Sequence, residues 1–426
     1  MNKQIIKNAD TGESYIKAKH KSGLDIYICE KHEFSTAYAI FGTRYGSVDN
    51  SFRKIGESDF TRVPNGIAHF LEHKLFESED GDAFSRYAKT GAAANAYTSF
   101  DRTCYLFTCT GNFDDSFDIL LDFVQHPYFT AETVAKEQGI IGQEIRMYDD
   151  SPDWMLLFNL LSCLYYNNPV KINIAGTEKT IAEITDKLLY KCYETFYNPS
   201  NMFIVVSGNV DADRVLKKID ESLKDREAVR FEREEIHEPD GIVCGEKRHE
   251  MAVSLPQFAL GYKMNTPKNG YLDTETVVET QMLTEIIAGK QSRLFESLLE
   301  KGYINKGFSS ELTEGRGFAI GMFSGQSAYP EQVADEIKKE ISRLQSEGID
   351  EDDFKSVQRM FYGRSVMMFN DVEGIGDALT GAACSESGLF DELDVIKNVT
   401  ADKLIKRLGE QFAQERSALS IILPKR

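Results

Sequence analysis

The chain has 426 residues, of which 42% are hydrophobic and 11% aromatic, a composition typical of a folded protein with enough core for two or more domains. Its 68 Asp and Glu against 49 Lys and Arg give a net charge of -19, and this negative charge repels nucleic acids and anionic lipids. We therefore expect a soluble protein without a nucleic-acid partner.

The N-terminus and the cysteines bear on cellular location. Residues 1–23 lack the continuous apolar stretch of a secretory signal, and no later segment is long and apolar enough to span a bilayer. The seven cysteines are scattered and form no CxxC pair, a pattern typical of reduced thiols packed in a core. We therefore expect a cytoplasmic protein that does not associate with membranes.

The first predicted elements are β-strands. Apolar residues alternate with polar ones at 13–30 and 34–47, and a similar pattern recurs at 251–264 in the second half. Strands that are grouped together ahead of long helices favour an α+β fold, in which helices are layered on one face of a mainly antiparallel sheet. A doubly wound α/β fold agrees less well because helices and strands do not alternate regularly.

The next element carries the first distinctive motif, GIAHFLEHKLFE at residues 66–77. Apolar residues at helical spacing after Asn65 predict a helix that begins near that residue. His69 and His73 then project from the same side of the helix one turn apart, which is the spacing that two imidazoles need to share one ion. Glu72 lies close enough to the ion's open position to hold a water, so its expected role is that of a general base.

Two glutamates further along could complete such a site. The pattern HxxEH arises by chance in a chain of this length on the order of once in a hundred, so the alternative of an ordinary amphipathic helix stays open on this motif alone. A catalytic zinc takes three protein ligands and leaves its fourth position to water. Glu137 and Glu144 lie two turns apart on one face of a predicted helix at 136–150. One would complete the ligand set and the other could accept a hydrogen bond from a ligand histidine, but the residues do not say which.

An internal repeat divides the chain. Residues 105–145 predict a strand, an amphipathic helix, a turn and a second helix, and residues 319–361 predict the same order. A stretch dense in charge separates the two halves. We therefore expect two tandem homologous domains, a catalytic metal-binding domain at 1–224 and a degenerate repeat without metal at 249–426, joined by a linker at 225–248.

The repeat locates the expected chemistry in the first half. Placing Phe129 opposite Ile349 aligns the halves by eye. In this alignment the two histidines and three glutamates of the first half fall opposite Gly289, Ser292, Arg293, Val357 and Arg364. Since none of these matches, we expect the second half to have kept only the scaffold.

The motifs together resemble a known family. HFLEH reverses the order of the HExxH motif and is similar to the inverzincins, the insulinase or pitrilysin type metallopeptidases that include mitochondrial processing peptidase. Three further segments resemble that family in order along the chain: residues 91–107 resemble its edge strand after the zinc helix, residues 173–181 a first-half loop, and residues 196–211 its final strand. The likeness therefore covers nearly all of the first half.

The resemblance assigns a role to each candidate residue. It implies that one zinc ion per chain is held by His69, His73 and Glu144. It makes Glu72 the general base and Glu137 the carboxylate that accepts a hydrogen bond from a ligand histidine without binding the zinc itself. The strand that it implies for pairing with the substrate backbone consists of Asn95, Ala96, Tyr97 and Thr98.

One departure from the family concerns substrate binding and partners. Active halves are usually complemented by an Arg and a Tyr of the second half about seven residues apart, whereas Arg293 and Tyr303 lie ten apart and Glu296 stands seven before Tyr303. Short bacterial members resolve this by pairing a chain that has the zinc motif with a related chain that lacks it. The resemblance therefore implies a heterodimer of this kind, with a homodimer as the alternative.

The expected function is that of a zinc-dependent endopeptidase acting on peptides or small unfolded protein segments. Zinc would activate a water for attack, with a glutamate as general base, and the substrate would add a strand to the sheet edge. The alternative is a non-catalytic or weakly active scaffold subunit of a processing complex. A structural zinc site agrees less well, because such sites are normally closed by four ligands.

Overall fold

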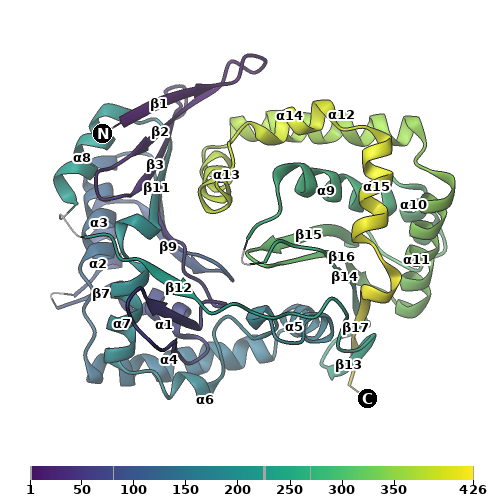
Figure 1. Ribbon diagram of the computed structural model, residues 1–426, viewed down its shortest axis with the longest axis horizontal. Coiled ribbons are helices and arrows are strands. Elements are labelled where there is room, and N and C mark those ends of the chain that lie inside the picture. The colour runs from purple at the N-terminus through teal and green to yellow at the C-terminus, as the bar shows by residue number, and fades with distance from the viewer. Residues whose placement is uncertain (1, 80, 224–226, 269, 426) are drawn as a thin grey trace. The chain divides into compact units, whose positions relative to one another are not determined.

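The computed structural model describes residues 2–79, 81–223, 227–268 and 270–425 (Figure 1). The ends of the predicted domains at residues 1, 224 and 426, and the first two residues of the predicted linker, therefore lie outside the described residues.

The chain forms two compact units, and each is assembled from three separate stretches. The first unit comprises Met1–Ile145, Asn173–Glu234 and Val366–Leu389, and the second comprises Arg146–Ile172, Glu235–Ser365 and Phe390–Arg426. The chain thus passes between the units five times, after residues 145, 172, 234, 365 and 389. The predicted domain boundaries follow the sequence repeat rather than these contacts, and they stay a prediction.

A seven-stranded sheet forms the centre of the first unit. In sheet order its strands are β1 (Asn2–Lys7), β2 (Ser14–Lys19), β3 (Asp25–Glu30), β11 (Met202–Gly208), β4 (Ala37–Thr43), β10 (Thr103–Cys109) and β9 (Ala93–Thr98). Every neighbouring pair is antiparallel except β3 with β11. The central strands β4 and β11 are buried along their whole length, as their continuous apolar sequences require.

Helices cover both faces of this sheet. Side chains alternate between the faces along a strand. On one face Tyr38 donates to Asp377 at 3.1 Å and Ser207 donates to the Val372 carbonyl at 2.7 Å, which anchors α13 (Val372–Ser385). Figure 1 shows α3 on the opposite side. The first-unit helices other than α13 are α1 (Ile67–Leu75), α2 (Ala83–Thr90), α3 (Phe113–Gln125), α4 (Ala131–Asp149, which ends past the unit boundary), α6 (Glu178–Ile181), α7 (Asp186–Phe196) and α8 (Ala212–Ser222).

The second unit repeats this plan around a five-stranded sheet. Its order is β13 (Glu246–Met251), β17 (Ser417–Pro424), β14 (Gln257–Lys263), β16 (Phe318–Gln326) and β15 (Ser309–Gly315). Its helices include α5 (Pro152–Leu164), which packs on β14 and β17, and α9 (Thr274–Ala288), which packs on β15 and β16. Figure 1 shows α5 and α9 on opposite sides of the sheet. The others are α10 (Arg293–Glu300), α11 (Pro330–Glu347), α12 (Glu351–Met367), α14 (Asp391–Asn398) and α15 (Ala401–Gln411).

The α+β class and the two-domain repeat are confirmed, with one addition and one correction. The addition is that each sheet is covered on its second face by a helix from the other half of the sequence, α13 on the first and α5 on the second. The correction concerns the alignment by eye. Its offset of 220 residues holds for α4 with α12 and for α5 with α13, but Gly289, Ser292 and Arg293 lie beyond α9, the helix that corresponds to α1 in element order. The offset fails because it changes along the chain: it is 207 residues between the first residues of α1 and α9 (274 minus 67) and 220 between those of α4 and α12 (351 minus 131).

The predicted linker contains a strand that its charged sequence conceals. β12 (Phe231–Arg233) pairs with β5 (Ser51–Lys54), which also pairs with β6 (Thr61–Arg62). The Phe231 ring packs edge-on against Phe196 at 4.9 Å between centroids, and Arg233 Nε lies 2.6 Å from Asp49 Oδ1. The contacts of Phe231 and Arg233 hold the start of the linker on the first unit.

Two further short strands, β7 (Glu77–Ser78) and β8 (Gly81–Asp82), follow α1 and pair with each other.

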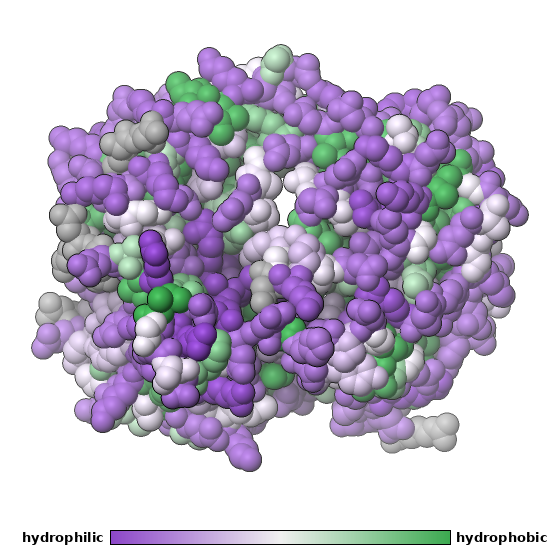
Figure 2. All heavy atoms as spheres, viewed as in Figure 1, coloured by the Kyte–Doolittle hydropathy of each residue, from purple (hydrophilic) through white to green (hydrophobic). Residues whose placement is uncertain are grey.

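One face of the molecule is largely hydrophilic. Hydrophilic residues dominate the face drawn in Figure 2, and apolar residues are scattered among them. Across the described residues, no helix combines the length and the apolar character needed to cross a bilayer.

Candidate metal centre

The start of α1 is fixed by a close contact between two backbones. Gly66 caps the helix with φ 93°, and a Cβ there would lie 2.3 Å from the Ala175 carbonyl oxygen. Gly176 has φ 74°, and a Cβ there would lie 2.3 Å from the Asn65 carbonyl oxygen. Both positions therefore require glycine for conformation and for space. The segment 173–181 thus holds the first turn of the helix that carries both histidines, a contact that its sequence did not reveal.

The structure brings His69, His73 and Glu144 together within the first unit. His69 Nε2 lies 3.5 Å from Glu144 Oε1, and His73 Nε2 lies 3.4 Å from Glu144 Oε2. One ligand atom from each of the three residues can be chosen so that all lie within 4.8 Å of one another. The two imidazole nitrogens and the carboxylate therefore converge from α1 and α4 on one point.

The spacing of these atoms fits a zinc ion. Zinc holds nitrogen and carboxylate oxygen at about 2.0–2.2 Å with tetrahedral angles, so neighbouring ligand atoms stand about 3.4 Å apart. Each histidine Nε2 lies at about that distance from one Glu144 oxygen, Oε1 for His69 and Oε2 for His73. Two imidazoles and one carboxylate are also the donor set of a catalytic zinc site with one position left for water.

Glu137 lies on the other side of His73. Its Oε1 is 3.0 Å from His73 Nδ1, and its side chain is buried. A neutral His73 whose Nε2 is left without a proton toward Glu144 would carry its proton on Nδ1 and donate a hydrogen bond from that N–H to Glu137. The geometry thus separates the two glutamates that the sequence left open: Glu144 faces the point of convergence and Glu137 stands behind a histidine.

The charge around His73 favours a cation. Burial lowers the pKa of His73, but the hydrogen bond with Glu137 and the nearby carboxylates of Glu72 and Glu144 outweigh it, so the net pKa is raised. His69 is also buried, and its Nδ1 has no hydrogen-bond partner among the described side chains and backbone. Packing rather than a hydrogen bond therefore orients the His69 ring.

Glu72 is tied to the edge of the sheet. Thr98 donates a hydrogen bond from Oγ1 to Glu72 Oε2 at 2.5 Å, and the Glu72 side chain is buried. Thr98 is the last residue of β9, so this bond connects α1 to the strand that is predicted to pair with the substrate. The resemblance gave Thr98 no such contact, and only the packing of α1 against β9 reveals it.

The predicted peptide-pairing residues lie on an edge strand. In the described part of the chain β9 pairs only with β10, so its second edge is open to another strand. Asn95 is exposed, and its Oδ1 accepts from the Ala96 backbone N–H at 2.9 Å. Tyr97 pairs in register with Cys104 of β10.

The second unit has no comparable cluster within its described residues. Its helix α9 contains no histidine. Arg293 begins α10 and lies 3.6 Å from Asp350 and from Asp353, and the Tyr303 ring packs against Tyr329 at 5.1 Å between centroids. Both residues thus contact neighbours within their own unit, and the Arg293 side chain is 71% exposed.

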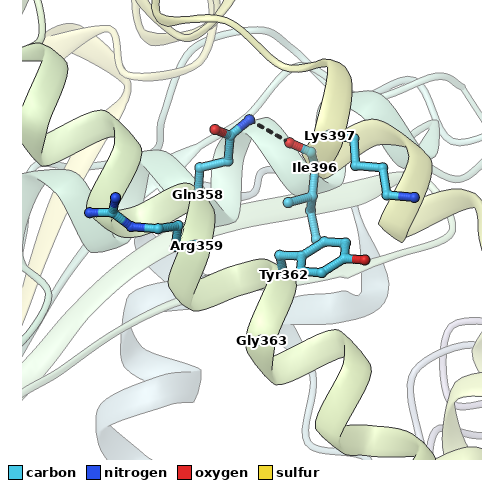
Figure 3. A pocket seen from close by; sticks show the side chains of 6 residues that line it. All are labelled: Gln358, Arg359, Tyr362, Gly363, Ile396 and Lys397. Atoms are coloured by element: carbon cyan, nitrogen blue, oxygen red, sulfur yellow. Dashed lines mark hydrogen bonds between the residues drawn. The ribbon is translucent and has the colours of Figure 1, made fainter. Parts of the chain in front are cut away.

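A pocket in the second unit is of a different kind. It has a volume of about 410 Å³ between α12 and α14 and is lined by Gln358, Arg359, Tyr362, Gly363, Ile396 and Lys397. Figure 3 shows the hydrogen bond of 2.7 Å from Gln358 to the Ile396 carbonyl at its rim. No carboxylate, imidazole or thiol lines it, so it lacks the side chains that most often bind metal ions in proteins.

Comparison with known proteins agrees with the architecture. Residues 58–178 match the family described as insulinase (peptidase family M16), and residues 183–361 match the peptidase M16 inactive domain. The chain is 40% identical to YmfH of Bacillus subtilis, an uncharacterized zinc protease, over 97% of both chains. Its fold is similar to that of a protein of Alicyclobacillus acidocaldarius described as M16-like, with a TM-score of 0.93 and 33% identity over 96% of this chain and 98% of that one. It is also similar to that of a Helicobacter pylori protease, with a TM-score of 0.82 and 20% identity over 97% and 100%. By sequence and by fold, the chain belongs to peptidase family M16.

Proposed function

We propose that the protein is a zinc-dependent endopeptidase that hydrolyses peptides or flexible protein segments. The observation that carries the proposal is the convergence of His69, His73 and Glu144 at zinc-ligand spacing beside a buried glutamate. A site that served only structure would be expected to use a fourth protein ligand. Here Glu72, the nearest remaining carboxylate in the motif, is hydrogen-bonded to Thr98 instead.

The chain's own residues divide the work of hydrolysis. Zinc, when bound, would polarise the scissile carbonyl and acidify a water. Glu72 accepts the proton of the attacking water at a carboxylate oxygen and then delivers it to the leaving amine. Thr98 holds that carboxylate in place through its hydroxyl. The open edge of β9 binds an extended peptide by main-chain hydrogen bonds, which favours substrates without fixed structure.

Glu137 is proposed to set the orientation and basicity of His73. Changing Glu137→Gln should lower zinc affinity by about 10- to 100-fold, because the histidine loses the charged acceptor on its Nδ1. Competition with a chromogenic chelator measures this directly. Glu132→Gln, at an exposed position in the first turn of the same helix, is the matched control and should leave the affinity unchanged. Equal affinities in the two variants would remove Glu137 from this role.

The proposed partner is a related chain without the zinc motif. Arg293 and Tyr303 lie ten residues apart rather than about seven, and Glu296 stands seven before Tyr303, which supports the view that this chain's second half does not supply the usual substrate-binding pair. A partner with an intact pair would complete the site. A homodimer is the alternative arrangement.

The test is peptidase activity of purified, zinc-loaded protein on a quenched fluorogenic peptide library. The assay is run with the chain alone and after mixing with its nearest relative that lacks HxxEH from the same cell. Cleavage in either arrangement supports the peptidase, and cleavage only on mixing supports the heterodimer. Stoichiometric zinc without cleavage in both arrangements would favour a scaffold subunit and overturn the proposal.

A further inference from the structure

Two cysteines that lie far apart in the sequence meet in the second unit. Cys163 is in the last turn of α5 and is fully buried, whereas Cys244 lies in the segment before β13 and is exposed. Their sulfur atoms are 3.3 Å apart across 81 residues of sequence. Among the seven cysteines, all free in this structure, Cys244 is the exposed one. The expectation of plain core thiols therefore does not describe it.

The backbones around the two sulfurs are already held together. The N–H groups of Val243 and Cys244 donate to the Cys163 carbonyl at 2.7 and 3.3 Å. Tyr166 donates from its hydroxyl to the Ile242 carbonyl at 2.7 Å, and Glu238 accepts from the backbone N–H of Tyr166 at 2.8 Å. These bonds fasten residues 238–244, here called the linker strap, along the end of α5. These backbone hydrogen bonds, before and at Cys244, therefore keep the two sulfurs close together.

We propose that Cys163 and Cys244 form a reversible disulfide that locks the linker strap to α5. A disulfide places its sulfurs about 2.05 Å apart, so a pair at 3.3 Å needs to close by about 1.2 Å. Because the backbones are in hydrogen-bond contact, side-chain rotation and a small shift of the strap suffice. The site lies wholly in the second unit and does not depend on the metal centre.

The two thiols have different parts in the oxidation, for which the oxidant is hydrogen peroxide. Exposed Cys244 reacts first: its thiolate attacks one peroxide oxygen, the O–O bond breaks, and the leaving hydroxide becomes water with the proton that the thiol released. The Cys163 sulfur then attacks the Cys244 sulfur, the S–O bond breaks, and the second hydroxide leaves as water with the Cys163 proton. In sum, two thiols lose two electrons and peroxide is reduced to two waters. Burial and the contact with Cys244 raise the pKa of Cys163 to about 12, so this sulfur resists direct oxidation and is kept for the second step.

The test uses the full chain, reduced and then treated with one to ten equivalents of hydrogen peroxide. Free thiols are blocked in denaturant, the protein is digested without reduction, and cross-linked peptides are mapped by mass spectrometry. We expect a Cys163–Cys244 cross-link as the first disulfide, and its removal by dithiothreitol. The cross-link should raise the melting temperature of the oxidised protein, on the order of 5 °C, because it closes a long loop of the unfolded chain.

Two variants make the result decisive. Cys244→Ser changes an exposed side chain, so the protein should fold, and both the cross-link and the rise in melting temperature should vanish. Cys29→Ala alters a buried cysteine of the first unit that is hydrogen-bonded to the Ser14 carbonyl. This variant should keep both the cross-link and the rise in melting temperature. Oxidation of Cys244 to the sulfinic acid while Cys163 remains free to be blocked would overturn the proposal. So would cross-links that join either cysteine to a different partner.

Discussion

Glu72→Gln should reduce turnover by about 10²- to 10⁴-fold while the protein keeps its zinc. Glutamine has nearly the shape of glutamate and can still accept the hydrogen bond that Thr98 donates, but it cannot take a proton from water, and loss of a general base has an effect of this size. The Michaelis constant should change little, because substrate affinity comes from the strand edge. Steady-state kinetics on a fluorogenic peptide that the protein cleaves measure the turnover number and the Michaelis constant. Metal analysis of the same sample measures the zinc content.

The control for this variant is Glu79→Gln, an exposed residue just beyond α1. It changes the net charge by the same amount and lies only seven residues away, so it should retain full activity. If Glu72→Gln keeps full turnover with zinc bound, Glu72 has no role in proton transfer. If it loses zinc as well, the glutamate contributes to the metal site itself.

His73→Ala should lose both zinc and activity. The substitution removes one of three ligand atoms and leaves Glu137 and Glu144 without the imidazole that they face at 3.0 and 3.4 Å. Removing a residue that is hydrogen-bonded to a metal ligand lowers metal affinity by about 10- to 100-fold. Loss of the ligand itself should therefore lower zinc affinity by more than the upper end of that range. Zinc per chain after dialysis against a weak chelator gives the result.

His32→Ala is the matched control, because its imidazole is exposed and lies 3.9 Å from Glu30 on the surface of the first unit. It should bind zinc as tightly as the unaltered protein. One zinc per chain in His73→Ala at unchanged affinity would refute its assignment as a ligand. Circular dichroism distinguishes loss of the ligand from loss of the fold, since α1 also packs against β9 and β10.

The choice between Glu137 and Glu144 shows where sequence patterns stop. The two residues lie on one face of α4, and helical periodicity makes them equivalent. Only the crossing of α4 over α1 decides that Glu144 reaches the Nε2 atoms and that Glu137 reaches Nδ1 of His73. The histidine pair itself was predictable because both side chains belong to one helix turn. The family resemblance implies a ligand role for Glu144 and a supporting role for Glu137, and these roles stay a prediction.

Each sheet is covered on one face by a helix from the other half of the sequence, α13 on the first sheet and α5 on the second. This exchange of helices could not have been predicted from periodicity. α5 and α13 have apolar residues suited to any sheet face, so their patterns predict burial without naming the sheet that buries them. The strand β12 was hidden for a different reason. Its sequence, Phe231 to Arg233, is mostly charged, and it is held by its pairing with β5 and by the contacts of its two end residues.

The exchange also sets the order in which the protein can be completed on the ribosome. All seven strands of the first sheet have been made by Gly208, but α13 ends at Ser385, 177 residues later (385 minus 208). At about 5–20 residues per second this interval lasts roughly 10–35 s. Throughout it the face that bears Tyr38 and Ser207 lacks α13, the helix that packs on it in the folded protein. Conversely, α5 emerges well before β14 and β17, the strands on which it packs. Neither half can therefore finish folding during synthesis of that half, and a nascent chain must keep one sheet face and one apolar helix from other contacts until it is nearly complete.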